Sequence, residues 1–298
     1  MEEKQMMTNE QLEAELQSLR SKATVAKILT YGSGAAAILC FITGLIPVAI
    51  VFIVLALVGG YQLEKNSSRL KKILSDNVIS SVLKEALGDA VEYNPWGKIN
   101  PGSMVFPFSY NCADGSDHIK AVYNGLNIEL GDIELINETD NTDENGNTQK
   151  NSQTCFKGQW LTCDFGKELS GQVYISEWTK KDRRSMKSNV TMDNEQFGKR
   201  FCVRADDPQE AYYILTPHMM EYIISIADKS GGTVYMSFLR DGKLHVAVQT
   251  GHDFFELGKS NANVEELRRK FLGELRWFTD IVDTLRVEDT LYKKEANI

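Results

Sequence analysis

Five basic side chains crowd one short stretch and give the densest cluster of charge in the sequence. They are Lys180, Lys181, Arg183, Arg184 and Lys187. Ammonium and guanidinium groups clustered in this way attract anionic lipid headgroups when they are held near a bilayer. A solvated loop is the alternative reading of the same residues. We predict a lipid-headgroup contact here, so that replacing the five residues with Gln lowers liposome binding of the soluble domain.

The side chains that could bind a metal or transfer protons are scattered. The four histidines, which lie far apart in the chain, are His118, His218, His245 and His252. His252 lies near Asp253 and Glu256, a grouping that could bind a metal or act as a base, but a surface loop is the favoured explanation. Residues 141–152 match only the first half of a calcium loop, because the twelfth position is Ser152 rather than Glu. The sequence therefore predicts no metal, no cofactor and no identifiable catalytic residue.

The cysteines and the net charge narrow the class of protein. The chain has 298 residues, a formal net charge of −8 and five cysteines. An acidic chain lacks the basic footprint of a nucleic-acid-binding protein. Cys155 and Cys163 share one face of a predicted strand, but two ligands do not complete a zinc site. Scattered cysteines without a C-x-x-C motif indicate reduced thiols in a cytosolic domain.

The long apolar stretch at residues 28–61 contains no charged side chain. A bilayer span needs about 20 apolar residues, so the stretch is longer than one span. Gly44 and Pro47 interrupt it with residues suited to a helix end and a helix start. The stretch therefore predicts a helical hairpin with spans at 24–43 and 47–63. One long tilted helix, with the large domain outside the membrane, is the alternative.

Charge on both sides of the apolar stretch favours the hairpin. Its basic flanks are Arg20, Lys22 and Lys27 before it, and Lys65, Arg69, Lys71 and Lys72 after it. Lys and Arg collect on the cytoplasmic side of membrane spans. We therefore expect an integral plasma-membrane protein with both termini in the cytoplasm.

The remaining chain predicts an α+β fold, in which a mostly antiparallel sheet is packed with helices. The expected regions are a polar N-terminal helix at 1–23, the hairpin at 24–63, a linking helix at 64–94 and a globular domain at 95–290. Expected strands include 127–136, 154–165, 171–178, 196–204, 233–239 and 243–249. Asp207 and Thr216 each precede a proline and predict two helix starts. A further helix is expected at 263–285. Residues 137–153, the least structured stretch, contain no apolar side chain and predict an acidic hairpin loop.

Three stretches resemble a widespread prokaryotic family of membrane-associated proteins of unknown function. They read CFKGQWLTCDFGKELSGQVYI, EQFGKRFCVRADDPQEAYYILTPHMMEYI and VYMSFLRDGKLHVAVQTGHDFFE. The sharpest piece joins Phe197, Phe201, Val203 and Asp207 to the run Ala211, Tyr213, Ile214, Leu215, Thr216 and Pro217. The resemblance spans about residues 25–285 and implies a bacterial protein with an N-terminal membrane hairpin. It brings no established activity, and the acidic stretch at 137–153 departs from the family pattern.

Taken together, these features predict a membrane-anchored, non-enzymatic interaction or sensing module on the cytoplasmic face. Its expected partners are the lipid bilayer and another membrane or cytosolic protein, with no nucleic acid. The alternative is a membrane-tethered, hydrolase-like enzyme that acts on lipid or envelope substrates. That alternative requires a deep pocket lined by paired titratable groups. The ligand and the oligomeric state do not follow from the sequence.

Overall fold

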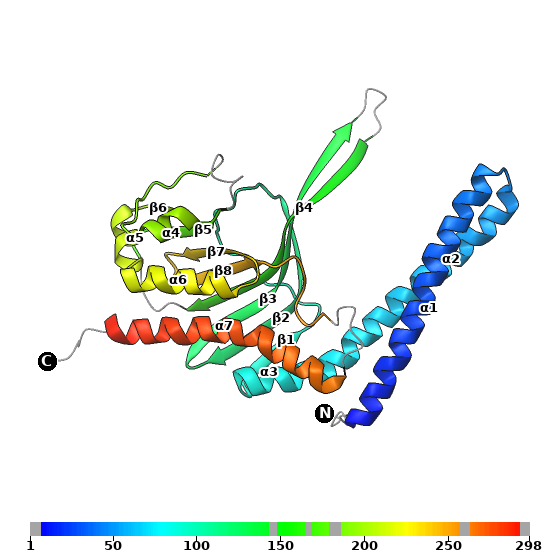
Figure 1. Ribbon diagram of the computed structural model, residues 1–298, viewed down its shortest axis with the longest axis horizontal. Helices are drawn as coiled ribbons and strands as arrows, with labels where there is room; N and C mark the ends of the chain where they lie inside the picture. Colours follow the sequence, from blue (N-terminus) through cyan, green and yellow to red (C-terminus); the bar gives the residue numbers. More distant parts are fainter. Residues whose placement is uncertain (1–6, 143–147, 165–168, 179–185, 257–262, 293–298) are drawn as a thin grey trace. The chain divides into compact units, whose positions relative to one another are not determined.

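The computed structural model describes residues 7–142, 148–164, 169–178, 186–256 and 263–292 (Figure 1). The chain divides into two compact units. The first comprises Met1–Val82 and Lys259–Lys270, and the second comprises Leu83–Gly258 and Phe271–Ile298. Each unit is described by itself below.

The first unit contains a hairpin of two long helices. Helix α1 spans Asn9–Ile42 and helix α2 spans Ile46–Leu74. Gly44 occupies the turn with φ of 76°, a backbone conformation that glycine adopts without strain. Pro47 lies in the first turn of α2, where its missing N–H costs no hydrogen bond. The predicted division at Gly44 and Pro47 is confirmed.

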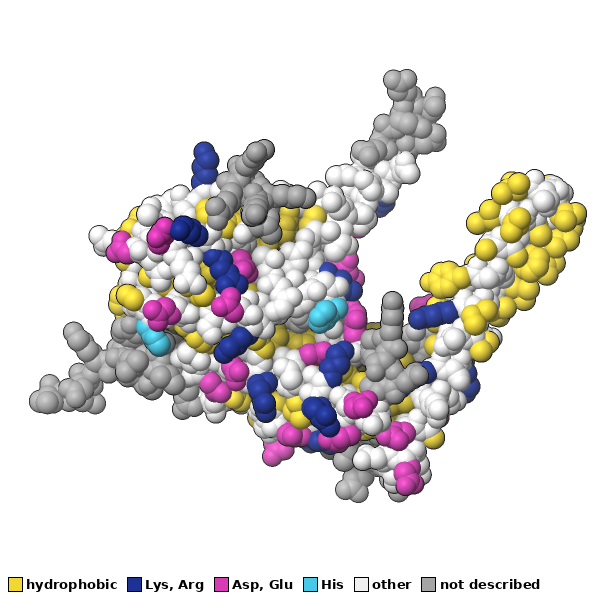
Figure 2. Space-filling view, viewed as in Figure 1, with side chains coloured by type: hydrophobic (Ala, Val, Ile, Leu, Met, Phe, Trp, Pro, Cys, Tyr) yellow, Lys and Arg dark blue, Asp and Glu magenta, His cyan; other side chains and the backbone are white. Residues whose placement is uncertain are grey.

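The hairpin leaves many of its large apolar side chains exposed. Both helices are long and apolar enough to cross a membrane. Large apolar side chains such as Ile28, Phe41 and Leu57 are more than 60% exposed, and Figure 2 shows an almost continuous apolar surface at this end. Small residues instead form the contact between the helices: a Cβ added at Gly59 would lie 2.6 Å from Thr30 Oγ1. Gly59 of α2 thus allows the two helices to approach closely at Thr30 of α1.

Both helices extend well past the apolar segment. Thr8 and Gln11 form a capping box at the start of α1, and the buried leucines of its first turns are Leu12, Leu16 and Leu19. Helix α2 continues through a π-helical turn, η1 (Ser75–Ile79), into α3 (Ser80–Leu87). The linking helix predicted at 64–94 therefore ends at Leu87, and Val91, expected on that helix, begins a strand instead.

The second unit is built on a sheet of eight strands among the described residues. In chain order the strands are β1 (Val91–Asn94), β2 (Cys112–Tyr123), β3 (Leu126–Thr142), β4 (Thr148–Asp164), β5 (Val173–Glu177), β6 (Phe201–Ala205), β7 (Thr233–Phe238) and β8 (Lys243–Gln249). Their order across the sheet is β1-β2-β3-β4-β8-β7-β5-β6. Every pair is antiparallel, which confirms the predicted α+β fold class.

Helices α6 (Pro217–Lys229) and α7 (Val264–Tyr292) cover one face of the sheet (Figure 1). The indole nitrogen of Trp277 donates to the carbonyl oxygen of Ile226 at 3.3 Å and ties the two helices together. The irregular segment at 95–111 covers the opposite face. There Phe106 packs on Tyr235, and Ser176 Oγ donates to the carbonyl oxygen of Val105 at 2.5 Å. Both faces of the sheet are thus covered. The side chains on both faces of a central strand are therefore buried.

Two local predictions differ from the structure. The stretch 137–153 forms a hairpin as expected, but strands β3 and β4 stay paired through most of it and project from the sheet as a two-stranded arm (Figure 1). Backbone pairing needs no apolar side chain, which explains the error. The strand predicted at 196–204 starts with a short helix instead, α4 (Glu195–Arg200), because Asn194 caps it through the amide of Phe197.

The predicted proline-led helices are both present. Asp207 caps α5 (Pro208–Ile214) through the amide of Gln209, and Thr216 caps α6 through the amide of Met219. The β7–β8 hairpin turns at Gly242, whose φ is 76°. These short-range signals depend on a single side chain or a single backbone angle, and such features can be read from the sequence.

Candidate functional site

The sequence-predicted site residues are dispersed. Four of the five basic residues proposed for lipid contact, Lys180, Lys181, Arg183 and Arg184, lie outside the described residues, and Lys187 is exposed. His118 pairs with Glu129 at 2.9 Å on β2 and β3, and His218 lies exposed on α6. Within the described part of the chain, no three His, Cys, Asp or Glu side chains are placed to hold a metal ion. Of the calcium-loop positions, Asp143, Asn145 and Gly146 also lie outside it.

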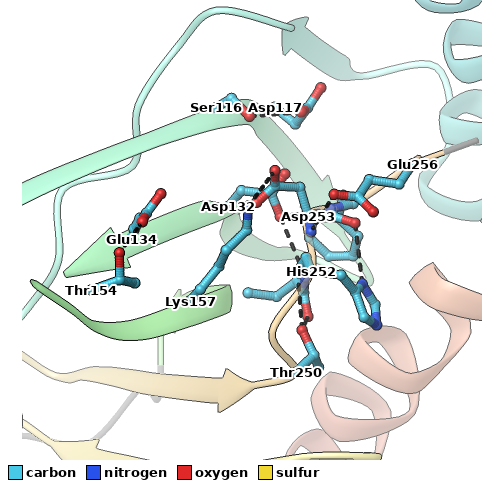
Figure 3. A network of polar contacts seen from close by, with 12 residues as sticks. Ser116, Asp117, Asp132, Glu134, Thr154, Lys157, Thr250, His252, Asp253 and Glu256 are labelled. Atoms are coloured by element: carbon cyan, nitrogen blue, oxygen red, sulfur yellow. Dashed lines mark hydrogen bonds and ion pairs between the residues drawn. The ribbon is translucent and has the colours of Figure 1, made fainter. Parts of the chain in front are cut away.

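The strongest constellation of ionisable groups centres on Asp132, which the sequence did not single out (Figure 3). Asp132 lies on β3 and is 2% exposed. Its Oδ1 accepts a hydrogen bond from the amide of Phe254 at 2.8 Å and a longer one from Gln159 Nε2 at 3.4 Å. Its Oδ2 is buried without a hydrogen-bonding partner among the described residues. The carboxyl group therefore fastens the loop after β8 to the middle of the sheet.

A second buried carboxylate, that of Asp117, faces this group from β2. Asp117 is 3% exposed and has a positive φ of 55°, at a bulge where the β2–β3 register shifts. Its two oxygens accept hydrogen bonds from the hydroxyls of Tyr93 and Ser116. The bulge thus turns one acidic side chain of β2 toward an acidic side chain of β3.

The pKa of the Asp132 carboxyl is raised to about 9: burial is the largest cause, the hydrogen bond from the Phe254 amide opposes it, and the negative charges of Asp117 and Asp253 add to it. Asp132 is consequently a neutral carboxylic acid at pH 7. The proton can lie on Oδ2, the oxygen that has no hydrogen-bonding partner among the described residues.

The loop at 250–256 is held by further contacts around this pair. Gln159 Nε2 donates to the carbonyl oxygen of His252 at 2.6 Å, and Thr250 Oγ1 donates to Gln159 Oε1 at 2.8 Å. Lys157 forms an ion pair with Asp253 at 3.0 Å. Next to them Phe254 packs on Phe278 of α7. The predicted grouping of His252 with Asp253 and Glu256 is therefore part of a loop anchor, in which His252 contributes its carbonyl oxygen.

A second buried site surrounds His245 on β8. The indole N–H of Trp160 donates to His245 Nδ1 at 3.1 Å, and Thr162 Oγ1 lies 3.0 Å from the same nitrogen. Because an indole N–H only donates, Nδ1 must be the acceptor, and the neutral ring carries its proton on Nε2. Burial lowers the pKa of His245 to about 4, which matches this tautomer. A Cβ at Gly102 would lie 2.3 Å from the ring, so the segment 95–111 seals the site.

One feature of the sequence indicates the Asp132 site, although the predictions from the sequence did not use it. Along β3 the apolar positions change phase, from Ile128 and Leu130 to Ile133 and Leu135. In a regular strand such a change moves the apolar residues to the other face. Asp132 lies at the switch, in a strand that is covered on both sides, so its polar position is buried rather than solvated.

Comparison with known families gives a match in the second half of the chain. Residues 154–287 match the family described as "Protein of unknown function (DUF3137)". The chain carries a DUF3137 domain. The match is narrower than the region 25–285 expected from the resemblance. Comparison with the curated proteins and with the solved structures finds no match.

The boundary of the DUF3137 domain divides the Asp132 site. Gln159, Asp253 and Phe254 lie within the matched residues, whereas Asp117 and Asp132 precede them. The DUF3137 domain thus supplies the loop and its anchoring partners, and the strands before it supply the carboxyl pair. Two helices able to cross a membrane precede the domain, as the resemblance implied.

Proposed function

We propose that the protein is a membrane-anchored, non-enzymatic interaction or sensing module. The α1–α2 hairpin spans the bilayer, and the α+β domain and both termini lie on the cytoplasmic side. The basic residues at 180–187 contact anionic headgroups, and the module acts by binding the membrane and a protein partner. This proposal rests on the hairpin together with the closed character of the ionisable sites in the domain.

The geometry of the hairpin supports the proposed orientation. Arg69 near the end of α2 forms an ion pair with Glu15 near the start of α1, with the nitrogen and oxygen 2.6 Å apart. The two basic flanks therefore lie at the same end of the hairpin. Since positive flanks stay in the cytoplasm, this end is assigned to the cytoplasmic side and the turn at Gly44 to the outside.

The chemistry of the domain favours binding over catalysis. A catalytic acid or base must reach a substrate, whereas Asp117, Asp132 and His245 are each at most 5% exposed. Each is engaged with neighbouring strands or with the loop at 250–256. All five cysteines are free thiols, which suits a reducing compartment.

Topology mapping tests the orientation. In a Cys40→Ser background, a cysteine placed at Thr43 should react in intact cells with a thiol reagent that does not cross membranes. A reporter fused to Ile298 should be active only in the cytoplasm. Labelling at Thr43 with a cytoplasmic reporter supports the proposal. An external reporter at Ile298 would reject the cytoplasmic domain and redirect the search to envelope substrates.

Reconstitution tests the lipid contact. The full chain is placed in nanodiscs of neutral or anionic lipid, and proteolytic protection of residues 180–187 is compared. Protection should rise with anionic lipid and be lost when the five basic residues become Gln. Lys199→Gln and Lys229→Gln serve as matched controls at other sites of the domain. Equal protection in both lipids would remove the headgroup contact.

A further inference from the structure

The first unit contains a cavity at the end of the hairpin where the basic flanks lie. It has a volume of about 420 Å³ and is lined by Glu13, Gln17, Arg20 and Ser21 of α1, and by Asn263 and Val264 at the start of α7. Small-molecule sites typically enclose ~300–1,000 Å³. The cavity is therefore large enough for a polar ligand, and its lining carries one carboxylate and one guanidinium.

The start of α7 forms the wall opposite α1. Asn263 and Glu266 cap the helix reciprocally, with the amide of Glu266 donating to Asn263 Oδ1 at 2.8 Å. The amide of Val264 approaches Glu13 Oε1 at 3.5 Å. The cavity is thus a gap between two helices whose ends are fixed, rather than a dent on a single helix.

The depth of the cavity relative to the bilayer follows from its position on α1. Thr24, which also lines it, is where the predicted membrane span begins. Arg20 and Ser21 therefore lie at the level of the lipid phosphates. Glu13 is about two helical turns further from the bilayer than Arg20. Along the membrane normal, the cavity presents a cation first and an anion beyond it.

This order of charges complements a zwitterionic headgroup whose phosphate lies nearest the acyl chains and whose ammonium lies further out. We propose that the cavity binds the headgroup of an aminophospholipid, with Arg20 and Ser21 on the phosphate and Glu13 on the primary ammonium. Arg is suited to the phosphate because its planar N–H groups can bind two oxygens at once. The inference rests on the hairpin spanning a bilayer, as proposed above.

The test measures lipid retention by the full chain with native mass spectrometry in mild detergent. The lipids are phosphatidylethanolamine, phosphatidylcholine and phosphatidylglycerol with identical acyl chains. Trimethylation removes the N–H donors from choline, and glycerol lacks the ammonium. Since charge-assisted hydrogen bonds are involved, phosphatidylethanolamine should be retained about tenfold more strongly than either of the others.

Two substitutions separate the two ends of the headgroup. Arg20→Gln should reduce retention of all three lipids about tenfold. Glu13→Gln should abolish the preference for phosphatidylethanolamine over phosphatidylglycerol and leave phosphatidylglycerol retention unchanged. Lys22→Gln and Glu10→Gln are matched controls on α1, because both side chains are exposed and neither lines the cavity. Both controls should behave as the wild type.

Three outcomes overturn the proposal. They are equal retention of the three lipids by the wild type, variants that match their controls, and displacement of the lipid by an equimolar amount of water-soluble phosphoethanolamine. Ser21→Val supports the assignment independently of Arg20 if it too weakens retention, and every variant is checked for a wild-type circular dichroism spectrum. If the wild type is washed from membranes by alkaline carbonate, the anchoring itself fails, and that result is distinct from a loss of lipid preference.

Discussion

Asp132 and His245 lie on opposite faces of the same sheet, and burial makes both of them neutral. Asp132 pairs in register with Gln159, and His245 pairs with Thr162, three residues further along β4. An odd separation on a regular strand places the two side chains on opposite faces. One face of the sheet is covered by α6 and α7 and the other by the segment 95–111. The two sites therefore lie in different layers of the domain.

The difference between the two sites lies in their protons. Asp132 gains a proton that an exposed carboxylate would not hold, whereas His245 lacks the proton that an exposed imidazole would bind below pH 6.5. The Asp132 site contains a second acid and a carboxyl oxygen that needs a proton. The His245 site has a donating indole already aimed at its acceptor nitrogen. The same loss of solvent therefore produces a protonated carboxyl group on one face and a neutral imidazole with a fixed tautomer on the other.

Truncation of His245 should give the largest loss of stability. His245→Ala leaves the N–H of Trp160 without its acceptor and opens a cavity beneath Gly102, so the free energy of unfolding should fall by about 3 kcal/mol. Denaturant unfolding of the full chain in detergent, followed by tryptophan fluorescence, measures this. His218→Ala, at an exposed position of α6, should change it by less than about 0.5 kcal/mol. Equal effects of the two substitutions would show that the His245 site is not a closed core site.

Truncation of Asp132 should cost less, and its amide variant should cost almost nothing. Asp132→Ala removes the acceptor of the Phe254 amide and should lower the free energy of unfolding by about 2 kcal/mol. Asp132→Asn has the shape of the protonated acid, because its oxygen can accept from Phe254 and its amide group can donate toward Asp117. It should therefore match or exceed the wild type at pH 7. If Asn costs as much as Ala, Asp132 is ionised in the folded protein.

The pH dependence of stability should have opposite signs at the two sites. The folded protein holds an extra proton on Asp132 between the ordinary carboxyl pKa near 3.8 and the raised pKa of about 9. Unfolding releases that proton, so stability falls as pH rises through this window, by up to about 1.4 kcal/mol per pH unit. For His245 the unfolded chain binds the extra proton between pH 4 and 6.5, so stability falls as pH decreases there.

The two effects oppose one another below pH 6.5, and only that of Asp132 remains above it. The wild type should therefore have nearly constant stability from pH 4.5 to 6.5 and lose stability from pH 6.5 to 9. Asp132→Asn should flatten the alkaline part, and His245→Gln should steepen the acidic part. Unfolding midpoints at five pH values measure both slopes. An alkaline slope that persists in Asp132→Asn would assign it to another group.

Local rules account for the elements that the sequence predicted well. The helix starts at Pro208 and Pro217, the break at Gly44 and the turn at Gly242 each depend on residues next to one another in the chain. The hairpin was predictable because bilayer thickness sets a minimum apolar length. The antiparallel sheet followed from strand alternation and short connections.

The candidate site was not predictable by the same rules. Asp132 meets Phe254 across 122 residues of sequence, and no local pattern encodes that contact. The alternation of apolar and polar residues at 127–136 is typical of a half-buried strand, in which Asp132 faces solvent, and the sequence does not reveal that both faces of the sheet are covered. Likewise, a strand was expected at 243–249, but the ring-sized space for His245 under Gly102 depends on where the segment 95–111 packs.

Removing the ion pair at the edge of the Asp132 site should have the smallest effect on the free energy of unfolding. It would show how much charge attraction contributes to this site. Lys157 and Asp253 have side chains that are 32% and 36% exposed, so solvent screens their attraction. Lys157→Met should lower the free energy of unfolding by at most about 1 kcal/mol, and added salt should shrink the difference. Lys199→Met, which removes a more exposed pair with Glu195, is the matched control.

The size of that effect distinguishes two ways of holding the loop at 250–256. The amide of Gly251 donates to the backbone carbonyl of Lys157 at 2.9 Å, a bond that survives the substitution. If the neutral Asp132 carboxyl and the backbone hold the loop, hydrogen exchange at the Phe254 amide should stay slow in Lys157→Met and become fast in Asp132→Ala. A loss in Lys157→Met as large as that in Asp132→Ala would instead assign the loop to charge attraction. In that case the loop beside Asp132 would be held by an ion pair, whereas the His245 site is held by contacts between uncharged groups.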